Sequence, residues 1–367
     1  MTSSNFGERV HDNRIDEITL ALKNTVEPDL GRDLVAAGLV RDLRVEGKSV
    51  YLTVVLTSPA SPHRDKIERE VRAAIGALGW PTEINISWTA EVSSNTGFGQ
   101  DGQTIPGVKN TIAVASGKGG VGKSTVAANL TVALRELGAN VGLLDGDIYG
   151  PNIPGMLGID GRPVIENDKI QPLAAFGVPV MSMGFLADPG QAVIWRGPMI
   201  AQALRQLIHD VAWGDLDYLI VDLPPGTGDA PLSLSQLLPL SGAVIVSTPQ
   251  EVALQDVRRG IAMFEKLRVP VLGVIENMSY FISPDTGSRF EIFDHGGARR
   301  AAEELGVPFL GEIPLDLEIR IASDNGRPVA ARGSADPIAR PYFDVAGLVT
   351  SEVTRLNAAR PDPLPVL

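Results

Sequence analysis

The nine residues at 117–125 constrain the fold of this chain more than any other segment. They read GKGGVGKST and lie between an apolar run at 111–115 and a helically spaced segment at 125–137. Glycines allow the backbone to wind closely around phosphate oxygens, and a following helix directs N–H groups and its positive dipole end at the same charge. A complete G-x-x-x-x-G-K-[ST] match between a strand and a helix therefore predicts a P-loop that binds a nucleoside triphosphate.

Two side chains of this loop carry its expected chemistry. Lys123 is expected to bridge the β- and γ-phosphates as a point charge, and the Ser124 hydroxyl is expected to bind Mg²⁺. The backbone of the whole loop is expected to surround the phosphates of ATP. The predicted ATP-binding residues of the loop are Gly117, Lys118, Gly119, Gly120, Val121, Gly122, Lys123, Ser124 and Thr125.

From residue 110 onward, apolar runs alternate with helically spaced segments. Near-continuous apolar runs separated by helices are typical of a parallel sheet that is covered on both faces. The predicted strands are 111–115, 141–144, 218–221, 243–247, 271–275 and 309–313, and the predicted helices are 125–137, 199–211, 252–267, 297–305 and 337–357. The predicted fold class is α/β, with a mostly parallel sheet and helices on both faces.

A small α+β domain is predicted before this sheet. Its expected elements are a helix at 14–25, strands at 39–45 and 50–56, a helix at 63–78 and a strand at 83–89. Residues 92–109 are rich in Ser, Gly, Asn and Gln and have no periodic apolar face, which indicates a linker. We therefore predict a small domain at 1–91 and a P-loop domain at 110–367.

Carboxylates follow two of the predicted strands. Asp145 and Asp147 come after the second strand of the P-loop domain, and Asp222 comes after the third. Because a carboxylate in this position can hold Mg²⁺ directly or through a water, we assign that role to Asp222. Asp145 is interpreted as structural. Gly226 is expected to donate its N–H to the γ-phosphate, so that hydrolysis would release its loop.

The second lysine of the loop, Lys118, directly follows the first glycine. In this respect the chain resembles the deviant Walker A ATPases, the group that includes MinD, ParA and the nitrogenase iron protein. The resemblance implies that Lys118 reaches the phosphates of the facing subunit in an ATP-bound homodimer and stabilises developing charge there. It also implies that Asp147 is a catalytic switch residue that orients the attacking water or the metal shell.

Two residues are candidates for contact with the base. Asn277 follows the fifth predicted strand and can offer its side-chain amide to the edge of adenine, a role that the resemblance supports. Pro314 follows the sixth strand, where related proteins line the adenine pocket. A proline that simply ends a strand is the open alternative for Pro314.

Longer strings narrow the resemblance. They are VASGKGGVGKST at 114–125, DGDIYGPNIP at 145–154, WRGPM at 195–199, DYLIVDLPPGTGD at 217–229, TPQEVAL at 248–254 and NMSYF at 277–281. In combination they resemble the Mrp/ApbC family of iron–sulfur cluster carrier ATPases over most of the chain. The segment EPDLG at 27–31 resembles the iron–sulfur-assembly domain that precedes the ATPase in many bacterial members. The resemblance implies an ATP-gated homodimer whose partners are iron–sulfur assembly or recipient proteins.

The chain departs from that family at its expected thiols. Ser283 and Thr286 stand where the family usually has a C-P-x-C pair, and Ser61 stands where the small domain commonly has a cysteine. The whole sequence contains no cysteine, and a hydroxyl that stays protonated near pH 7 is a poor iron ligand. No iron–sulfur ligand is therefore assigned. The downstream acidic residues and His295 fit no ligand signature and are interpreted as a solvated loop.

Composition limits the remaining partners. A formal net charge of −12 disfavours sequence-independent binding to phosphate backbones, so no nucleic-acid partner is expected. No apolar run reaches the roughly 18 residues that span a bilayer, and residues 1–13 lack the apolar core of a secretory signal. A cytoplasmic protein without stable membrane insertion is the expectation.

Three functions are consistent with these patterns. The first is an ATP-hydrolysing carrier or assembly factor for iron–sulfur clusters, which the resemblance favours. The second is an ATP-gated adaptor that docks assembly partners without binding a cluster, which the missing thiols favour. The third is a MinD- or ParA-like positioning ATPase, although residues 351–367 contain only Arg355 and Arg360 as basic residues and so lack a basic amphipathic helix.

Overall fold

The computed structural model describes residues 4–94, 104–148, 150–186 and 197–359. Contacts divide the chain into two units, one formed by residues 1–93 with 350–367 and the other by residues 94–349. Half of the predicted linker, at 95–103, lies outside the described residues, as do residues 195 and 196 of the WRGPM string.

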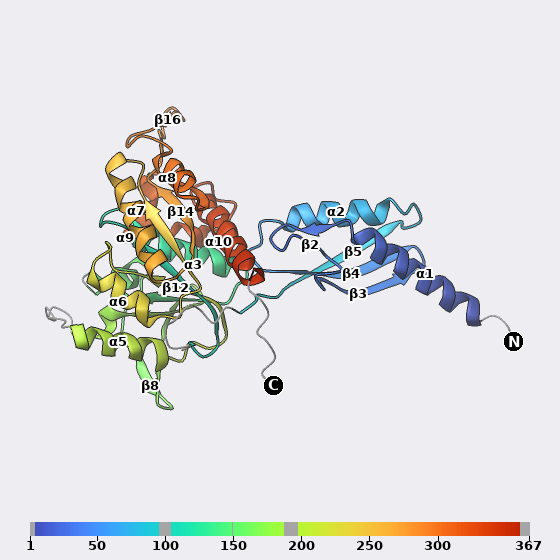
Figure 1. The fold of residues 1–367 in the computed structure, drawn as a ribbon, viewed down its shortest axis with the longest axis horizontal. Coiled ribbons are helices and arrows are strands. Elements are labelled where there is room, and N and C mark those ends of the chain that lie inside the picture. Colours follow the sequence, from blue (N-terminus) through green and yellow to red (C-terminus); the bar gives the residue numbers. More distant parts are fainter. Residues whose placement is uncertain (1–3, 95–103, 149, 187–196, 360–367) are drawn as a thin grey trace. The chain divides into compact units, whose positions relative to one another are not determined.

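The larger unit is built around an eight-stranded sheet (Figure 1). Every neighbouring pair in it is parallel except the pair of β10 and β11 at one edge. The predicted α/β class with a mostly parallel sheet is therefore confirmed. In spatial order the strands are β10 (Leu173–Ala175), β11 (Val178–Ser182), β7 (Val141–Asp145), β12 (Leu216–Asp222), β6 (Val108–Ala115), β13 (Gly242–Ser247), β14 (Val271–Asn277) and β17 (Phe309–Ile313).

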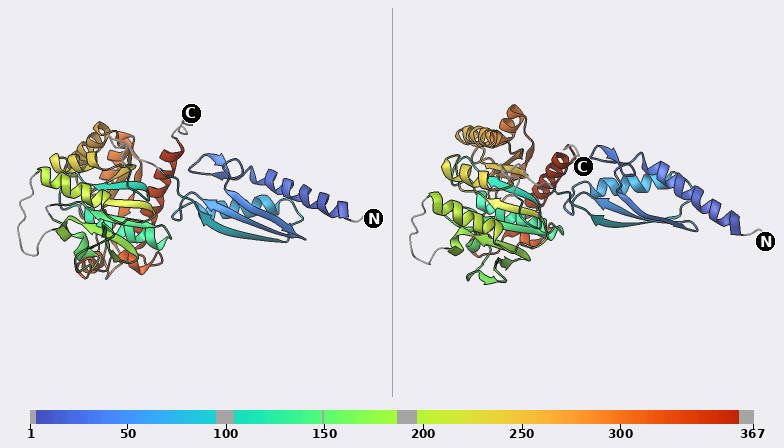
Figure 2. Two further views of the ribbon diagram at one scale, coloured as in Figure 1. Left: turned by 90° about the horizontal axis from the view of Figure 1, so that it is seen from below. Right: turned by 60° about the horizontal axis from the view of Figure 1, so that its bottom comes forward.

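Helices cover both faces of this sheet (Figure 2). One face packs against α5 (Gly197–His209), α6 (Asp229–Leu237), α7 (Glu251–Lys266) and α8 (Gly297–Leu305), with Leu207, Leu234, Phe264 and Ala301 in a single apolar cluster. On the other face, α3 (Lys123–Glu136) contacts β6, β7 and β12. Further described helices of the larger unit are α4 (Ile153–Met156), α9 (Leu317–Asp324) and the short 3₁₀ turns η1 (Met183–Leu186) and η2 (Val329–Arg332). The last helix, α10 (Arg340–Ala358), has residues in both units.

The strands of this sheet that the sequence did not predict lie at its β10 edge. β11 contains Pro179, which cannot donate to a ladder and therefore argues against a strand. The structure accommodates it because pairing with β7 begins only at the next residue, Val180. β10 has three residues, too few for a periodic signal, and it pairs antiparallel to β11.

Three helices were also absent from the sequence prediction. α4 is only four residues long, and α6 has Pro231 near its start, where the missing N–H costs little. α9 begins at a polar cap, because the Asp316 side chain accepts a hydrogen bond from the Glu318 N–H at 2.7 Å.

The smaller unit has its own core. Its sheet has β3 (Val40–Glu46) antiparallel to β4 (Ser49–Leu56), and β4 parallel to β5 (Glu83–Ala90). Apolar residues of α1 (Ser4–Leu22) and α2 (Arg64–Gly76) pack with this sheet in one cluster. β1 (Val26–Glu27) and β2 (Arg32–Asp33) are two residues long each and pair antiparallel with each other. α1 starts well before the helix predicted at 14–25. The prediction began too late because the first residues of α1 are mostly polar and give no clear apolar periodicity.

Two short antiparallel hairpins complete the larger unit. β8 (Val164–Glu166) pairs with β9 (Lys169–Gln171), and β15 (Phe281–Ile282) pairs with β16 (Arg289–Phe290). In the described part of the chain, no helix is both long and apolar enough to cross a membrane.

Candidate functional site

The loop between β6 and α3 has the backbone geometry that its glycines predict. Gly120 and Gly122 have φ values of 81° and 80°, in the left-handed region that favours glycine. A Cβ on Gly117 would lie 2.3 Å from the Cβ of Asp256 in α7, so this position has no room for a side chain. Gly119 is different, because an added Cβ there would meet no atom within 4 Å.

Lys123, Ser124 and Asp222 meet at the carboxyl end of the sheet. Lys123 Nζ lies 2.5 Å from Asp222 Oδ1, and Ser124 Oγ donates to Asp222 Oδ2, also at 2.5 Å. Lys123 is only 6% exposed and Asp222 only 1%. Asp222, nearly 100 residues further along the chain, therefore forms one cluster with the adjacent Lys123 and Ser124 beside the loop, and its ion pair with Lys123 is buried. Mg²⁺ prefers hard oxygen ligands, so the Ser124 hydroxyl and the Asp222 carboxylate fit it chemically.

Burial shifts the pKa values of two carboxyl groups in this region. Desolvation raises the pKa of Asp222, although Lys123 and Ser124 oppose the shift by stabilising the carboxylate. The pKa of Asp145 rises to about 7, first because the group is buried and second because the Asp222 charge is near. Asp145 thus responds to the charge of Asp222, its in-register partner on the adjacent strand.

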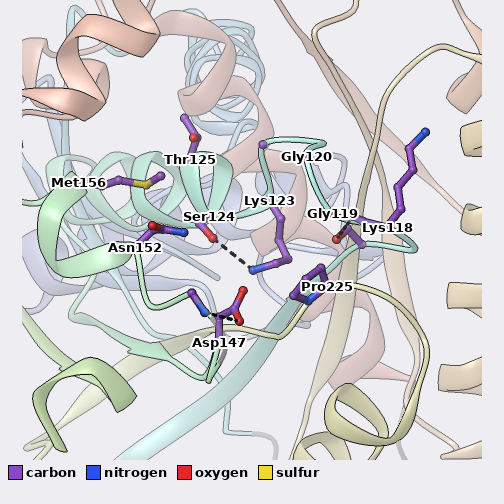
Figure 3. Close-up of a pocket in the computed structure, with 13 residues that line it drawn as sticks. Lys118, Gly119, Gly120, Lys123, Ser124, Thr125, Asp147, Asn152, Met156 and Pro225 are labelled. Atoms are coloured by element: carbon purple, nitrogen blue, oxygen red, sulfur yellow. Dashed lines mark hydrogen bonds between the residues drawn. The ribbon is translucent and has the colours of Figure 1, made fainter. Parts of the chain in front are cut away.

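A cavity of about 410 Å³ opens over the loop and is lined by Lys123, Ser124 and Asp147 (Figure 3). Asp147 is 7% exposed and accepts a hydrogen bond from the Gly150 N–H at 3.3 Å. Asp145 does not line this cavity and is fully buried. The two carboxylates of the same motif therefore occupy different environments, with Asp147 facing the space where phosphates would lie.

Lys118 lies at the rim of the same cavity. Its backbone carbonyl accepts a hydrogen bond from Ser116 Oγ at 2.9 Å, which fixes the backbone of the loop here. Its side chain extends away from Lys123 and Asp147 (Figure 3). The direction of this side chain suits a contact outside its own cavity.

The N–H of Gly226 donates to the Ser116 carbonyl at 2.9 Å. The expected hydrogen bond from this N–H to a γ-phosphate would require that backbone bond to open. Gly226 has a φ of 92°, in the region that favours glycine, and a Cβ added there would meet no atom within 4 Å.

A second cavity, of about 230 Å³, is lined by Asn277 and Pro314, the two residues predicted to contact adenine. It shares Gly122, Thr125 and Met156 with the first cavity, so the two form a continuous groove. Asn277 Nδ2 donates to the Val121 carbonyl at 2.8 Å. That bond holds the side chain against the loop and leaves its carbonyl oxygen for another donor.

Several groove residues were not predicted from the sequence. Asn152 and Met156 line the phosphate cavity, and Asp316 and Arg320 of α9 line the second one. Asn152 belongs to the DGDIYGPNIP string, which was a usable signal. The α9 residues follow no motif, because a short helix brings them to the groove only in the folded chain.

The predicted thiol positions carry hydroxyls in ordinary turns. Thr286 Oγ1 accepts a hydrogen bond from the Ser288 N–H at 3.2 Å, and the Ser283 N–H donates to the Ser288 carbonyl, within the β15–β16 turn. Ser61 Oγ accepts from the His63 N–H at 3.3 Å in the smaller unit. Among the described residues, no group of three or more His, Asp or Glu side chains is arranged to hold a metal ion.

The chain is similar to known proteins over most of its length. Residues 107–350 match the family model of ParA, described as the NUBPL iron-transfer P-loop NTPase, and residues 15–88 match that of an iron–sulfur cluster assembly protein. The iron–sulfur cluster carrier protein of Synechocystis is 45% identical over 92% of this chain and 98% of its own length. The protein of the same name from Deinococcus radiodurans is 46% identical over 96% and 99%.

A solved structure is also similar. The nucleotide-binding protein of Archaeoglobus fulgidus, in complex with ADP, is 41% identical and superposes with a TM-score of 0.57 over 65% of this chain and 93% of its own. The predicted resemblance to iron–sulfur cluster carriers of the ParA-like group is confirmed. The chain belongs to the family of NUBPL iron-transfer P-loop NTPases.

Proposed function

We propose that this protein binds and hydrolyses ATP as a homodimer and acts as an ATP-gated assembly factor for iron–sulfur proteins. The observation that carries the proposal is the cluster in which Asp222 binds Lys123 and Ser124, two residues that line the phosphate cavity. An ammonium group already placed beside Mg²⁺-type ligands is the arrangement that a triphosphate needs.

Binding of ATP would exchange the partners of this cluster. Phosphate oxygens compete with Asp222 for the Lys123 ammonium, which frees carboxylate oxygens to bind a cation. Ser124 and Asp222 would hold Mg²⁺, which when bound neutralises charge on the β- and γ-phosphates. Asp147 faces the cavity and would orient the attacking water, while adenine would enter the second cavity beside Asn277 and Pro314.

Lys118 would act on the nucleotide of the facing subunit. Its side chain extends away from Lys123 and Asp147 (Figure 3), and Gly119 beside it has open space that a second chain or a phosphate could approach. An ammonium group supplied in trans would stabilise charge that develops in the transition state.

Two candidate functions differ in whether the protein itself binds an iron–sulfur cluster. Curated relatives are named iron–sulfur cluster carrier proteins, and the small unit matches an iron–sulfur assembly domain. Yet the positions that would supply thiolates are Ser283, Thr286 and Ser61, and a hydroxyl is a poor iron ligand. This favours a second candidate, an adaptor that docks assembly partners in response to ATP without holding a cluster. A cytoplasmic location belongs to both proposals, and the names of the two curated relatives above favour both over a positioning ATPase.

Phosphate release from purified protein with ATP and Mg²⁺ tests the ATPase. We expect turnover that rises more than linearly with protein concentration, because the active form is a dimer. Nucleotide binding without any phosphate release would reject the hydrolytic function.

Anaerobic reconstitution with iron and sulfide separates the two cargo candidates. A stoichiometric cluster on the dimer would support the carrier and reject the adaptor. ATP-dependent capture of assembly proteins that persists in the presence of an iron chelator would support the adaptor, and loss of capture on chelation would reject it.

A further inference from the structure

Three polar residues form a row across the carboxyl ends of neighbouring strands. Ser182 ends β11, Asp145 ends β7 and Asp222 ends β12, and the strand registers place Asp145 opposite both of the others. None of the three is more than 1% exposed. Asp222 belongs to the cluster with Lys123 and Ser124 described above. Ser182 and Asp145 have no assigned part in nucleotide chemistry.

The Asp145 carboxylate accepts three hydrogen bonds from different parts of the chain. Oδ1 accepts from the Asp147 N–H at 3.1 Å, and Oδ2 accepts from the Ile153 N–H at 3.3 Å. Oδ2 also accepts from Ser182 Oγ at 2.9 Å. One carboxylate therefore holds both ends of the segment 147–153, of which all residues but 149 are described.

This segment forms one wall of the phosphate cavity. Asp147, Gly150 and Asn152 all line it. The distance of the segment from the phosphates is therefore set by the position of the Asp145 carboxylate.

Ser182 fixes that carboxylate from the neighbouring strand. Its hydroxyl donates to Asp145, and its oxygen accepts from the Gly184 N–H at 3.0 Å, so the hydroxyl has a defined orientation. Gly184 in turn lies against Pro151, whose Cγ would be 3.0 Å from a Cβ on that glycine. The strand end that carries Ser182 thus contacts the segment both through Asp145 and directly.

We propose that Ser182 is a positioning residue for ATP hydrolysis, acting through Asp145 to hold Asp147 and Asn152 against the phosphates. This inference rests on the proposed ATPase function. Ser182 touches neither nucleotide nor reacting atoms. Its contribution is to keep the Asp145 carboxylate in the one rotamer that accepts from both ends of the segment.

Ser182→Ala tests the proposal, with Ser235→Ala as its matched control. Ser235 is also a buried serine, but its hydroxyl donates to the Pro231 carbonyl within α6 and lies outside this network. We expect kcat of Ser182→Ala to fall roughly tenfold, the usual size for losing a hydrogen bond to a charged group. The Kd for ATP should stay within about threefold, because the P-loop itself is unchanged. Ser235→Ala should keep both constants.

Hydrogen exchange provides a readout that does not depend on turnover. In the nucleotide-free protein, the amides of Asp147 and Ile153 should exchange faster in Ser182→Ala than in the wild type or in Ser235→Ala. If their exchange is unchanged, or if it rises while kcat stays at the wild-type value, Ser182 is not a positioning residue.

A second variant covers the case in which Ser182→Ala fails to fold. Asp145→Asn keeps the size of the side chain but replaces one acceptor oxygen by a donor, so it should also release one end of the segment and lower kcat at retained affinity. If the wild-type protein shows no turnover, the proposed ATPase function is wrong. The amide exchange rates would still show whether Ser182 and Asp145 hold the segment 147–153.

Discussion

The P-loop and the β15–β16 turn lie in the same unit and differ in what surrounds their polar side chains. At the P-loop, Lys123 and Asp222 are almost completely buried and ion-paired with each other. At the turn, Thr286 is exposed and its hydroxyl only accepts a backbone hydrogen bond. Buried charge is costly unless it has partners, so the P-loop tolerates few substitutions, whereas an exposed turn accepts almost any polar residue.

This difference explains how a chain can keep one half of a family's chemistry and alter the other. Replacing thiols by hydroxyls in the turn leaves no buried group unpaired, so the fold loses little. Replacing Lys123 would leave a buried carboxylate without its cation. The P-loop is therefore tied to the stability of the sheet, and the β15–β16 turn is not.

The largest effect is expected from Lys123→Ala. Phosphate release should fall to background, because the charge that neutralises the phosphates is removed and binding weakens as well. The unpaired Asp222 should also lower the free energy of unfolding by about 3 kcal/mol. Phosphate release and denaturant unfolding measure the two effects.

Lys109→Ala is the matched control for this substitution. Lys109 lies near the start of β6, at the opposite end of that strand from the P-loop. It pairs with Asp217 at 2.8 Å, but its side chain is 44% exposed. The Lys109→Ala variant should retain its turnover and most of its free energy of unfolding. If Lys109→Ala and Lys123→Ala lose equal turnover and stability, the contrast between buried and exposed charge is wrong.

Lys118→Ala should have the next largest effect. Turnover is expected to fall on the order of 10³-fold, as when an arginine finger is removed, while the Kd for ATP changes little. Mixing Lys118→Ala subunits with Lys123→Ala subunits should restore part of the activity, because each mixed dimer contains one intact Lys123 faced by one intact Lys118. Without recovery in the mixture, the contact in trans is wrong.

The pH dependence of stability should reveal Asp145. Its pKa rises from 3.8 to about 7 on folding, so between these values the folded state binds more protons than the unfolded state. Stability from this group is therefore greatest at low pH and is lost as the pH rises through about 7. The stability difference between wild type and Asp145→Asn should fall by about 2 kcal/mol from pH 5 to pH 8. Parallel curves in denaturant titrations at these pH values would contradict the shift.

The smallest effect on hydrolysis is expected from the double variant Ser283→Cys with Thr286→Cys. Turnover should stay within about twofold, because the turn lies outside the nucleotide groove. Anaerobic reconstitution should nevertheless add a visible cluster absorbance that the matched Ser283→Ala with Thr286→Ala variant lacks. A large change in turnover would mean that the two regions are coupled.

The fold was predictable where burial makes the sequence pattern strong. All six predicted strands of the P-loop domain correspond to β6, β7, β12, β13, β14 and β17, because a strand buried on both faces reads as an apolar run. β10 and β11 were missed because an edge strand is short and because Pro179 is disfavoured in a ladder. Helices α4, α6 and α9 are too short to show a clear helical period, and of the three only α9 has a side-chain cap.

The site residues were likewise predictable only where the sequence pattern is strong. Lys123, Ser124 and Asp222 were predicted because each lies at a fixed place in a motif. Asp316 and Arg320 were not, since they enter the groove from a helix whose position depends on the whole fold. The roles of Asp145 and Asp147, two residues apart, could be separated fully only by burial.

The sequence by itself determined that a glycine-rich loop must connect a buried strand to a helix, and that no thiol is present for iron. Those facts depend on residue identity and local backbone freedom alone. Only the tertiary structure decided that Lys123 pairs with Asp222, that the Gly226 N–H is held by Ser116, and that Ser182 reaches Asp145. Such contacts join residues far apart in the chain, and they form because parallel strands bring their carboxyl ends to one edge of the sheet.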